Sequence, residues 1–275
     1  MISRIKRKVV AVAALVALST LSGSVFAVDC AEVREKYQCP MEKKKITLSF
    51  DDGVGDVTPK VLDVLKREQI QGTFFVLGNK VNCSIYKNDC DTNPSSASCQ
   101  SYQLCEERVD TLKRIKDEGH MIGSHSYKHD RHSALPAEVL EYNIKKSRAI
   151  LEPYLTTEPA IFRLPYGDGW FNQKEKPQVM EALERNGFKH IGWEMTAYDW
   201  NPDHQKGDKI LDNVMNQMCA GKGRVGVVLF HDGVFENEHV GRTYTADNLA
   251  RWIPTMRCAA DFVPLTHFKK DLRVK

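Results

Sequence analysis

The stretch Ile46-Thr47-Leu48-Ser49-Phe50-Asp51-Asp52-Gly53 joins a short run of β-type apolar residues to two carboxylates and a glycine. In folds built on parallel strands, side chains with chemical roles gather where the strands end. Two acidic residues at the end of a strand are therefore candidates for a functional site. Asp-Asp-Gly alone is equally typical of a simple turn in which aspartates cap the backbone, so other segments have to decide between the two interpretations.

Three other segments repeat this arrangement of polar residues after a short apolar run. They begin at His125 (HSYKH), Arg163 (RLPY) and Leu229 (LFH). Asp199 follows a further apolar run. If polar residues of this kind had no common role, they would be scattered over both ends of the strands. Their position after the strands favours one site at the carboxyl edge of a sheet.

Short apolar runs alternate with helical patterns along the chain, which predicts parallel strands joined by right-handed crossovers. Thr58-Pro59 is a typical helix start, because a capping hydroxyl precedes a proline in the first turn. Two more helices are expected over Asp208–Cys219 and Ala246–Cys258. We expect an irregular (β/α) barrel of seven strands, with an open doubly wound sheet as the alternative. The expected strands are Ile46–Phe50, Thr73–Leu77, Met121–Ser124, Ile161–Arg163, His190–Met195, Val225–Phe230 and Phe262–His267.

The first residues predict export. A basic start is followed by an apolar stretch from Val9 to Leu21 and by small residues near Ala27, so residues 1–27 are expected to be a cleaved signal peptide. A membrane anchor is the alternative, but the stretch is short of the roughly 20 residues that a span needs. This segment holds four of the 39 Lys and Arg residues and none of the 36 Asp and Glu, so the rest of the chain has a net charge of −1. Nothing in that balance calls for nucleic acid, and no membrane contact is expected after cleavage.

The eight cysteines all follow residue 27, and an even number in an exported chain predicts disulfides and a periplasmic or secreted location. We expect residues 28–44 to be an N-terminal segment and residues 45–275 to be a single domain with a cysteine-rich insertion at 82–106. The insertion has no C-x-x-C pair, which favours disulfides over a zinc cluster. We expect its four cysteines to pair among themselves and Cys219 to pair with Cys258.

The insertion at 82–106 fits neither a strand nor a helix pattern and is rich in Asn, Asp, Ser and Cys. Because it follows the second expected strand, it is expected at the rim of the site. Long loops of this kind are often functional. The alternative is an inert excursion that the disulfides hold in place.

Asp52, His125 and His129 offer one carboxylate and two imidazoles, which is typical of a catalytic metal site with room for water and substrate. The four-residue spacing of the histidines would suit a helical turn. The pattern is not that of H-E-x-x-H proteases, because position 126 is Ser. Alone, a His pair of this spacing is more often a coincidence on a polar surface. Zinc is the expected metal, and cobalt or nickel would also suit an N/O site.

The remaining polar residues suggest acid–base chemistry. If Asp52 holds the metal, Asp51 is free to act as a base, with Arg163 keeping it ionised and oriented. His231 would serve as the acid, tuned by Asp199. A single His at a strand end is otherwise most often a structural residue, and the remaining histidines are assigned that role.

Taken together, these segments resemble the five ordered motifs of the polysaccharide deacetylases, the NodB-homology family or carbohydrate esterase family 4. The resemblance covers Lys45 to Phe268 and implies the (β/α)7 NodB-homology fold. The motifs are 49–53 with Ser49 for the usual Thr, 125–129, 163–166, 199–200 and 229–231. One departure is Thr196, where the fourth motif usually begins with Asp.

The resemblance assigns roles to these positions. It implies Asp51 as base, a metal triad of Asp52, His125 and His129, and Arg163 as the residue that orients Asp51. The backbone N–H of Tyr166 would help to stabilise the oxyanion. Trp200 and Leu229 would form the wall of the pocket that holds the acetyl methyl group. His231 would be the general acid, and Asp199 would tune its pKa.

The expected function is therefore metal-dependent hydrolysis of the N-acetyl group of N-acetylglucosamine in a polysaccharide, most readily peptidoglycan, with release of acetate. Chitin oligosaccharides and O-acetylated xylan are the alternative substrates. The alternative to an enzyme is a glycan-binding protein on an inactive scaffold. In such a protein one of the metal-ligating residues or the catalytic base is expected to be missing from the sequence. The partner in every case is an acetylated glycan, and the sequence gives no signal for an oligomeric state.

Overall fold

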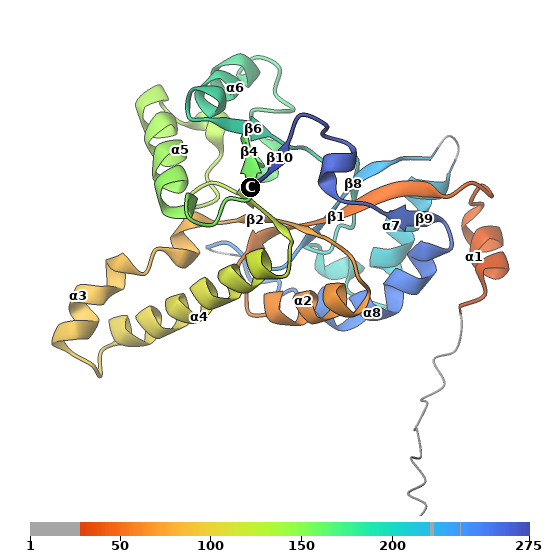
Figure 1. Ribbon diagram of the computed structural model, residues 1–275, viewed down its shortest axis with the longest axis horizontal. Helices are drawn as coiled ribbons and strands as arrows, with labels where there is room; N and C mark the ends of the chain where they lie inside the picture. Colours follow the sequence, from red (N-terminus) through yellow and green to blue (C-terminus); the bar gives the residue numbers. More distant parts are fainter. Residues whose placement is uncertain (1–27, 221–222, 237) are drawn as a thin grey trace, which may run out of the picture.

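The computed structural model describes residues 28–220, 223–236 and 238–275 (Figure 1). The predicted signal peptide, residues 1–27, lies outside the described residues. Within the described ranges, none of the helices combines the length and apolar character that a membrane span requires. The domain boundaries inferred from the sequence stay predictions.

One curved sheet of parallel strands forms the centre of the molecule. Its strands pair in the order β6-β5-β3-β2-β1-β8-β7, and β9 pairs with the first residues of β1. This confirms the predicted α/β fold as a barrel that stays open, because no pairing joins β6 to β7 among the described residues. The strands are β1 (Lys44–Gly53), β2 (Thr73–Val76), β3 (Met121–Ser124), β5 (Ala160–Phe162), β6 (Phe188–His190), β7 (Met195–Thr196), β8 (Gly226–His231) and β9 (Ala260–Phe262).

Two of the predicted strands were wrong in extent. The single strand expected over His190–Met195 is two short strands, because the carbonyls of Ile191 and Gly192 accept hydrogen bonds from the Arg163 guanidinium, both at 3.1 Å. The strand expected over Phe262–His267 ends at Phe262. Pro264 has no N–H to continue the ladder, and a 3₁₀ turn follows at Leu265–His267.

Amphipathic helices cover the sheet, and Figure 1 shows α2, α4 (Ala97–Asp117) and α8 on one side of the central strands and α5 and α6 on the other. In α2 the residues Val61, Leu62 and Leu65 are buried, as their helical spacing predicts. The core between sheet and helices contains stacked Phe50, Phe74 and Phe230. The helices are α2 (Thr58–Arg67), α5 (Ala137–Leu151), α6 (Lys176–Arg185), α7 (Lys209–Cys219) and α8 (Thr243–Arg257), and β4 (Thr157–Glu158) pairs antiparallel with β10 (Arg273–Val274).

The cysteine-rich insertion is helical, so the prediction of an irregular loop was wrong. Helices α3 (Ser84–Thr92) and α4 (Ala97–Asp117) lie side by side and are joined by two disulfides, Cys83–Cys105 and Cys90–Cys99. The pairing of these four cysteines among themselves is thereby confirmed. Ser, Asn and Asp are poor helix formers, but tertiary contacts and cross-links override such weak preferences.

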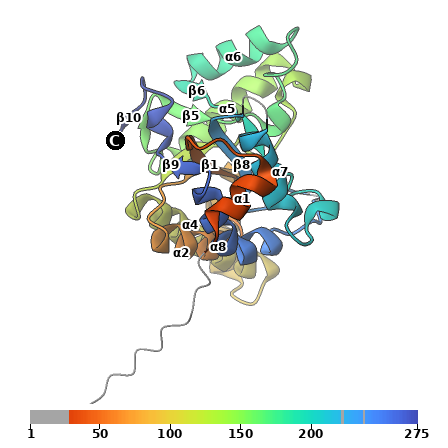
Figure 2. The ribbon, with the colours of Figure 1, turned by 90° about the vertical axis from the view of Figure 1, so that its right-hand side faces the viewer.

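The predicted pairing of Cys219 with Cys258 was wrong. Cys219 is joined to Cys39 and Cys258 to Cys30, so both disulfides tie the N-terminal segment to the ends of α7 and α8. That segment forms helix α1 (Cys30–Tyr37), which Figure 2 shows beside α7. Among the many pairings that eight cysteines allow, sequence cannot choose without knowing which chain ends meet in space.

Candidate active site

The predicted site residues converge at the carboxyl edge of the sheet. Asp51 and Asp52 lie at the end of β1, paired with the end of β8, where Asp51 is opposite His231. All of the predicted residues except Arg163 and Asp199 line one cavity of about 550 Å³, and these two lie fully buried behind it. Residues that are distant in sequence therefore share one pocket because parallel strands end at the same edge.

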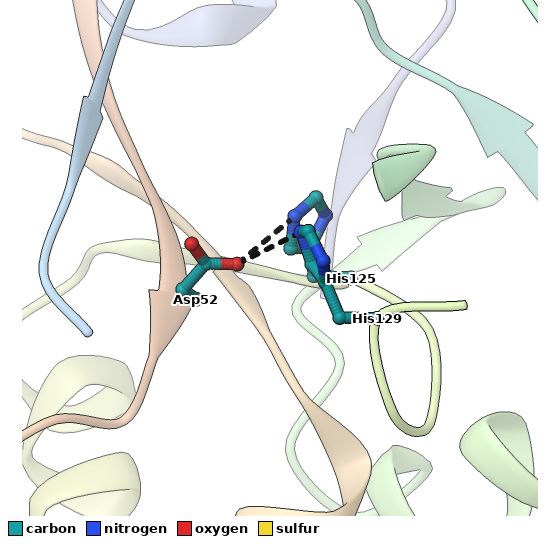
Figure 3. Close-up of side chains that lie close together, drawn as sticks. All are labelled: Asp52, His125 and His129. Carbon is teal, nitrogen blue, oxygen red and sulfur yellow. Dashed lines mark ion pairs between the residues drawn. The ribbon is translucent and has the colours of Figure 1, made fainter. Parts of the chain in front are cut away.

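The predicted metal ligands line this cavity and face one another (Figure 3). Oδ1 of Asp52 lies 3.3 Å from Nε2 of His125 and 3.2 Å from Nε2 of His129. All three residues are buried, and their ligand atoms lie within 4.8 Å of one another. The two histidines do not lie on a helical turn, as their spacing suggested. Positive φ angles at Ser126 (76°) and His129 (68°) turn the chain instead, so that both rings point to Asp52.

The chemistry of these three side chains fits a divalent cation. Nδ1 of His125 lies 2.8 Å from the carbonyl oxygen of Arg163, which can only accept, so Nδ1 carries the proton and Nε2 can be a ligand. Burial, together with the neighbouring His125, lowers the pKa of His129 to about 3. Oδ1 of Asp52 is buried and has no hydrogen-bond partner among the described residues.

The charge of the two carboxylates also favours a cation at this position. Burial would raise the pKa of Asp52, but the neighbouring imidazole of His125, with Nε2 3.3 Å from Oδ1, lowers it well below its usual range. Burial would likewise lower the pKa of His125, yet Asp51 and Asp52 raise it. The same negative field that draws a proton to His125 attracts a metal ion, which would compete with that proton.

Asp51 is held by a buried arginine. Nη1 of Arg163 donates to Oδ1 of Asp51 at 2.8 Å and to Oγ of Ser49 at 2.8 Å. The guanidinium is inaccessible to solvent and packs on the ring of Phe75, with Cζ 4.0 Å from the ring centroid. Burial lowers the pKa of Arg163, and the charge of Asp51 opposes that shift. The pair leaves Oδ2 of Asp51 free, 3.7 Å from Nε2 of His125.

His231 and Asp199 form a second buried pair at the cavity wall. Nδ1 of His231 lies 2.7 Å from Oδ1 of Asp199, and Oδ2 accepts from the His231 backbone N–H at 2.9 Å and from Thr245 Oγ1 at 3.1 Å. Burial would lower the pKa of His231, but Asp199 outweighs it and raises the pKa to about 9. At neutral pH the imidazole is therefore protonated, with Nε2 as the remaining N–H.

The upper walls of the cavity are aromatic. Tyr166 and Trp200 are 44% and 45% exposed, whereas Leu229 is buried at 5%. The ring of Phe235 stacks on His129, with centroids 4.0 Å apart and planes 12° from parallel. The side chain of Thr196, the departure from the fourth motif, lines the same cavity.

Several lining residues were not foreseen from the sequence: Trp193, Tyr198, Phe235, Glu238 and Arg242. For Tyr198 and Phe235 the available signal was an aromatic residue shortly after an expected strand end, whereas Trp193 lies inside the strand expected over His190–Met195. The expectation that the insertion forms the rim was wrong, since none of the residues lining this cavity belongs to 82–106. Its helices extend away from the body of the molecule at the α3 end (Figure 1).

Comparison with known proteins gives a family and several relatives. Residues 38–191 match the sequence profile described as polysaccharide deacetylase. A peptidoglycan-N-acetylglucosamine deacetylase of Bacillus cereus is 30% identical over 193 residues, which cover 70% of this chain and 57% of the relative. The peptidoglycan-N-acetylmuramic acid deacetylase PdaA of Bacillus subtilis is 28% identical over 182 residues, covering 66% and 58%. The matches thus span less than two thirds of either relative.

Solved structures show the same architecture. The Bc1960 peptidoglycan N-acetylglucosamine deacetylase superposes with a TM-score of 0.59 at 27% identity, covering 85% of this chain and 93% of that chain. A carbohydrate esterase family 4 pseudoenzyme from Bacillus anthracis superposes with a TM-score of 0.57 at 19% identity, covering 83% and 66%. The second likeness concerns the fold alone, so activity has to be argued from the side chains of the site.

Proposed function

The chain belongs to the polysaccharide deacetylase family, as its motifs predicted, and we propose that it is a hydrolase that removes the N-acetyl group from N-acetylglucosamine residues of peptidoglycan. One observation carries the proposal. A buried carboxylate held by an arginine, Asp51, and a protonated imidazole, His231, lie in the same cavity as the Asp52, His125 and His129 cluster. Such an arrangement suits amide hydrolysis, which needs a base for water and an acid for the departing amine.

Each residue has a distinct task in this mechanism. A divalent ion held by Asp52, His125 and His129, most readily zinc, would act as a Lewis acid toward the carbonyl and lower the pKa of a bound water. Asp51 takes a proton from the attacking water, and Arg163 fixes the orientation of its carboxylate. The backbone N–H of Tyr166 donates to the oxygen that gains charge. His231 then gives its Nε2 proton to the leaving nitrogen, which could not depart as an anion.

The setting proposed for this chemistry is outside the cytoplasm, in the periplasm or secreted. Four disulfides join all eight cysteines, and such cross-links persist in oxidising compartments. The relatives named for peptidoglycan act on a polymer that lies in the same kind of compartment. The proposed preference for peptidoglycan is inferred from the similarity to these two peptidoglycan deacetylases.

Acetate release from three substrates tests the proposal directly. The oxidised protein would be incubated with peptidoglycan, N-acetylated chitin oligomers and O-acetylated xylan. We expect acetate from the N-acetylated glycans, with the highest rate on peptidoglycan. Acetate from xylan alone would make the protein an O-esterase. Binding of these glycans without acetate release from any of them would make it a glycan-binding protein.

The pH dependence of kcat tests the role of His231. The acid form of this residue exists below its pKa, which Asp199 raises, so activity is expected to fall as pH rises through that pKa. Asp199→Asn removes the negative charge and is expected to move this alkaline limb to lower pH. Thr245→Val removes one hydrogen bond to Asp199 but keeps the charge of Asp199. The alkaline limb of the kcat profile should therefore move far less in this variant. Identical alkaline limbs in all three proteins would contradict the assignment of His231 as the acid.

A further inference from the structure

The two imidazoles of the candidate metal site are supported in different ways. Nδ1 of His125 lies 2.8 Å from the carbonyl oxygen of Arg163, which fixes both the tautomer and the tilt of that ring. Nδ1 of His129 is buried and has no hydrogen-bond partner within the described ranges of the chain. A histidine that ligates a metal usually donates its second N–H to an outer partner, so a different contact has to orient the His129 ring.

That contact is aromatic. The ring of Phe235 stacks on the His129 imidazole, with centroids 4.0 Å apart and planes within 12° of parallel. The ring of Tyr166 approaches the same imidazole edge-to-face, with centroids 4.5 Å apart and planes at 69°. Stacked and edge-to-face rings prefer particular separations and tilts. The two contacts therefore limit the directions in which Nε2 of His129 can point.

Phe235 is carried by the segment that joins β8 to α8. This segment begins directly after the proposed acid, His231, which ends β8. Near its other end the guanidinium of Arg242, which is 2% exposed, forms an ion pair with Glu238. The segment is thus anchored on both sides of Phe235, which keeps its ring against His129.

A simpler role for Phe235 would be to fill the cavity wall. Tyr198 and Trp200 line the same cavity, but Tyr198 has its ring contacts with Trp200 and His204 and not with a metal ligand. A side chain that only fills a wall can be replaced by an aliphatic one of similar size. A side chain that orients an imidazole by stacking has to be flat, so the two roles predict different results from substitution.

We propose that Phe235 is a positioning residue of the metal site, and that its ring holds the His129 imidazole where a hydrogen-bond acceptor would usually hold it. The inference rests on the proposed function and adds to it a residue that lies outside the five sequence motifs. Affinity for zinc then depends on a flat ring at position 235 and not on apolar bulk alone.

Zinc titration of variants at position 235 separates stacking from bulk. Phe235→Leu keeps apolar bulk and removes the flat ring, and we expect it to weaken zinc binding about tenfold, the lower end of the usual effect of losing an outer partner. Phe235→Tyr keeps the ring and is expected to bind zinc as the wild type does. Tyr198→Leu is the matched control, because Tyr198 lines the same cavity without a ring contact to His129, and its affinity should be unchanged.

A second readout reports the orientation of the ligands. Cobalt also suits an N/O site of this kind, and its visible absorption depends on the geometry of its ligands. At saturating cobalt we expect a changed spectrum in Phe235→Leu and the wild-type spectrum in Phe235→Tyr. The unfolding temperatures of the metal-free proteins show whether each variant is folded. If Phe235→Leu does not fold, Phe235→Met carries the same comparison.

Two results would overturn this inference and leave the proposed function intact. One is equal zinc affinity and an equal cobalt spectrum in the wild type and Phe235→Leu. The other is a loss of affinity in Phe235→Tyr as large as that in Phe235→Leu, since the ring would then have no special role. If the wild type bound neither zinc nor cobalt, the metal site itself would fail, and the inference would fail with it.

Discussion

Replacing Asp51 with Asn is expected to lower kcat for acetate release by about 10²- to 10⁴-fold, the usual contribution of a general base. Asn has the same shape and can still accept from Arg163 through its Oδ1, but it cannot take a proton from water. The metal ligands are untouched, so metal affinity is expected to change only a few-fold. Initial rates and a zinc titration of the same preparation measure both quantities.

The same substitution has a cost in stability that must be separated from its effect on catalysis. Arg163 is fully buried, and Asp51 is the carboxylate that it contacts. Removing one partner of a buried ion pair leaves the other charge uncompensated, which commonly costs about 3–5 kcal/mol. Rates are therefore to be compared at a temperature where circular dichroism reports both proteins as folded. Activity close to that of the wild type in folded Asp51→Asn would exclude Asp51 as the base.

Asp168→Asn is a matched control for this experiment. Asp168 accepts hydrogen bonds from the N–H and Oγ of Ser133 at 2.8 and 2.9 Å and lies outside the residues that line the catalytic cavity. The same loss of one carboxylate there is expected to leave kcat within a few-fold of the wild type. A large fall in both variants would indicate general damage to this edge of the sheet.

Removal of divalent metal is expected to abolish acetate release, and added zinc is expected to restore it. Asp52, His125 and His129 direct their ligand atoms at one point. A cation bound there would relieve the repulsion between the carboxylate oxygen and the two imidazole nitrogens. Binding to the folded state alone also raises stability by linkage, so the unfolding temperature should rise with zinc concentration. Calorimetry with and without chelator measures this shift independently of activity.

His129→Ala is expected to weaken zinc binding by more than about 100-fold, because loss of a direct ligand should exceed the 10- to 100-fold effect of losing an outer partner. His239→Ala removes an exposed histidine and serves as the control with unchanged affinity. Two results would contradict the metal site: full activity in excess chelator, or equal zinc affinity in both variants. The two measurements are independent, since the titration needs no substrate.

The geometry of the catalytic edge could be predicted because it follows from local sequence patterns. Each motif directly follows a run of β-type residues, and parallel strands bring their carboxyl ends together. Asp51, His125, Arg163 and His231 therefore meet, as the sequence indicated. Strand alternation alone does not account for the different contacts of Asp51 and Asp52, because both line the cavity and Asp52 has a φ of 64°, outside the extended region.

Other features depend on contacts between distant segments, which no local pattern reports. The partners of Cys30 and Cys219 follow from where the N-terminal segment packs. The helices of the insertion form although Ser, Asn and Asp disfavour them, because α3 and α4 pack together under two cross-links. The chain is not a single strand from β6 to β7, because the carbonyl oxygens of Ile191 and Gly192 between them accept hydrogen bonds from the Arg163 guanidinium.

By itself, then, the sequence determined the parallel strands, the chemistry at their ends and the family, because strand pattern and motif residues are adjacent along the chain. Only the tertiary structure decided which aromatic residues wall the site, how the cysteines pair and where the barrel stays open. These features depend on residues such as Trp193, Cys219 and Phe235, which come from separate loops and helices. Their proximity results from packing of the whole chain, and packing is encoded in many weak contacts and not in any one segment.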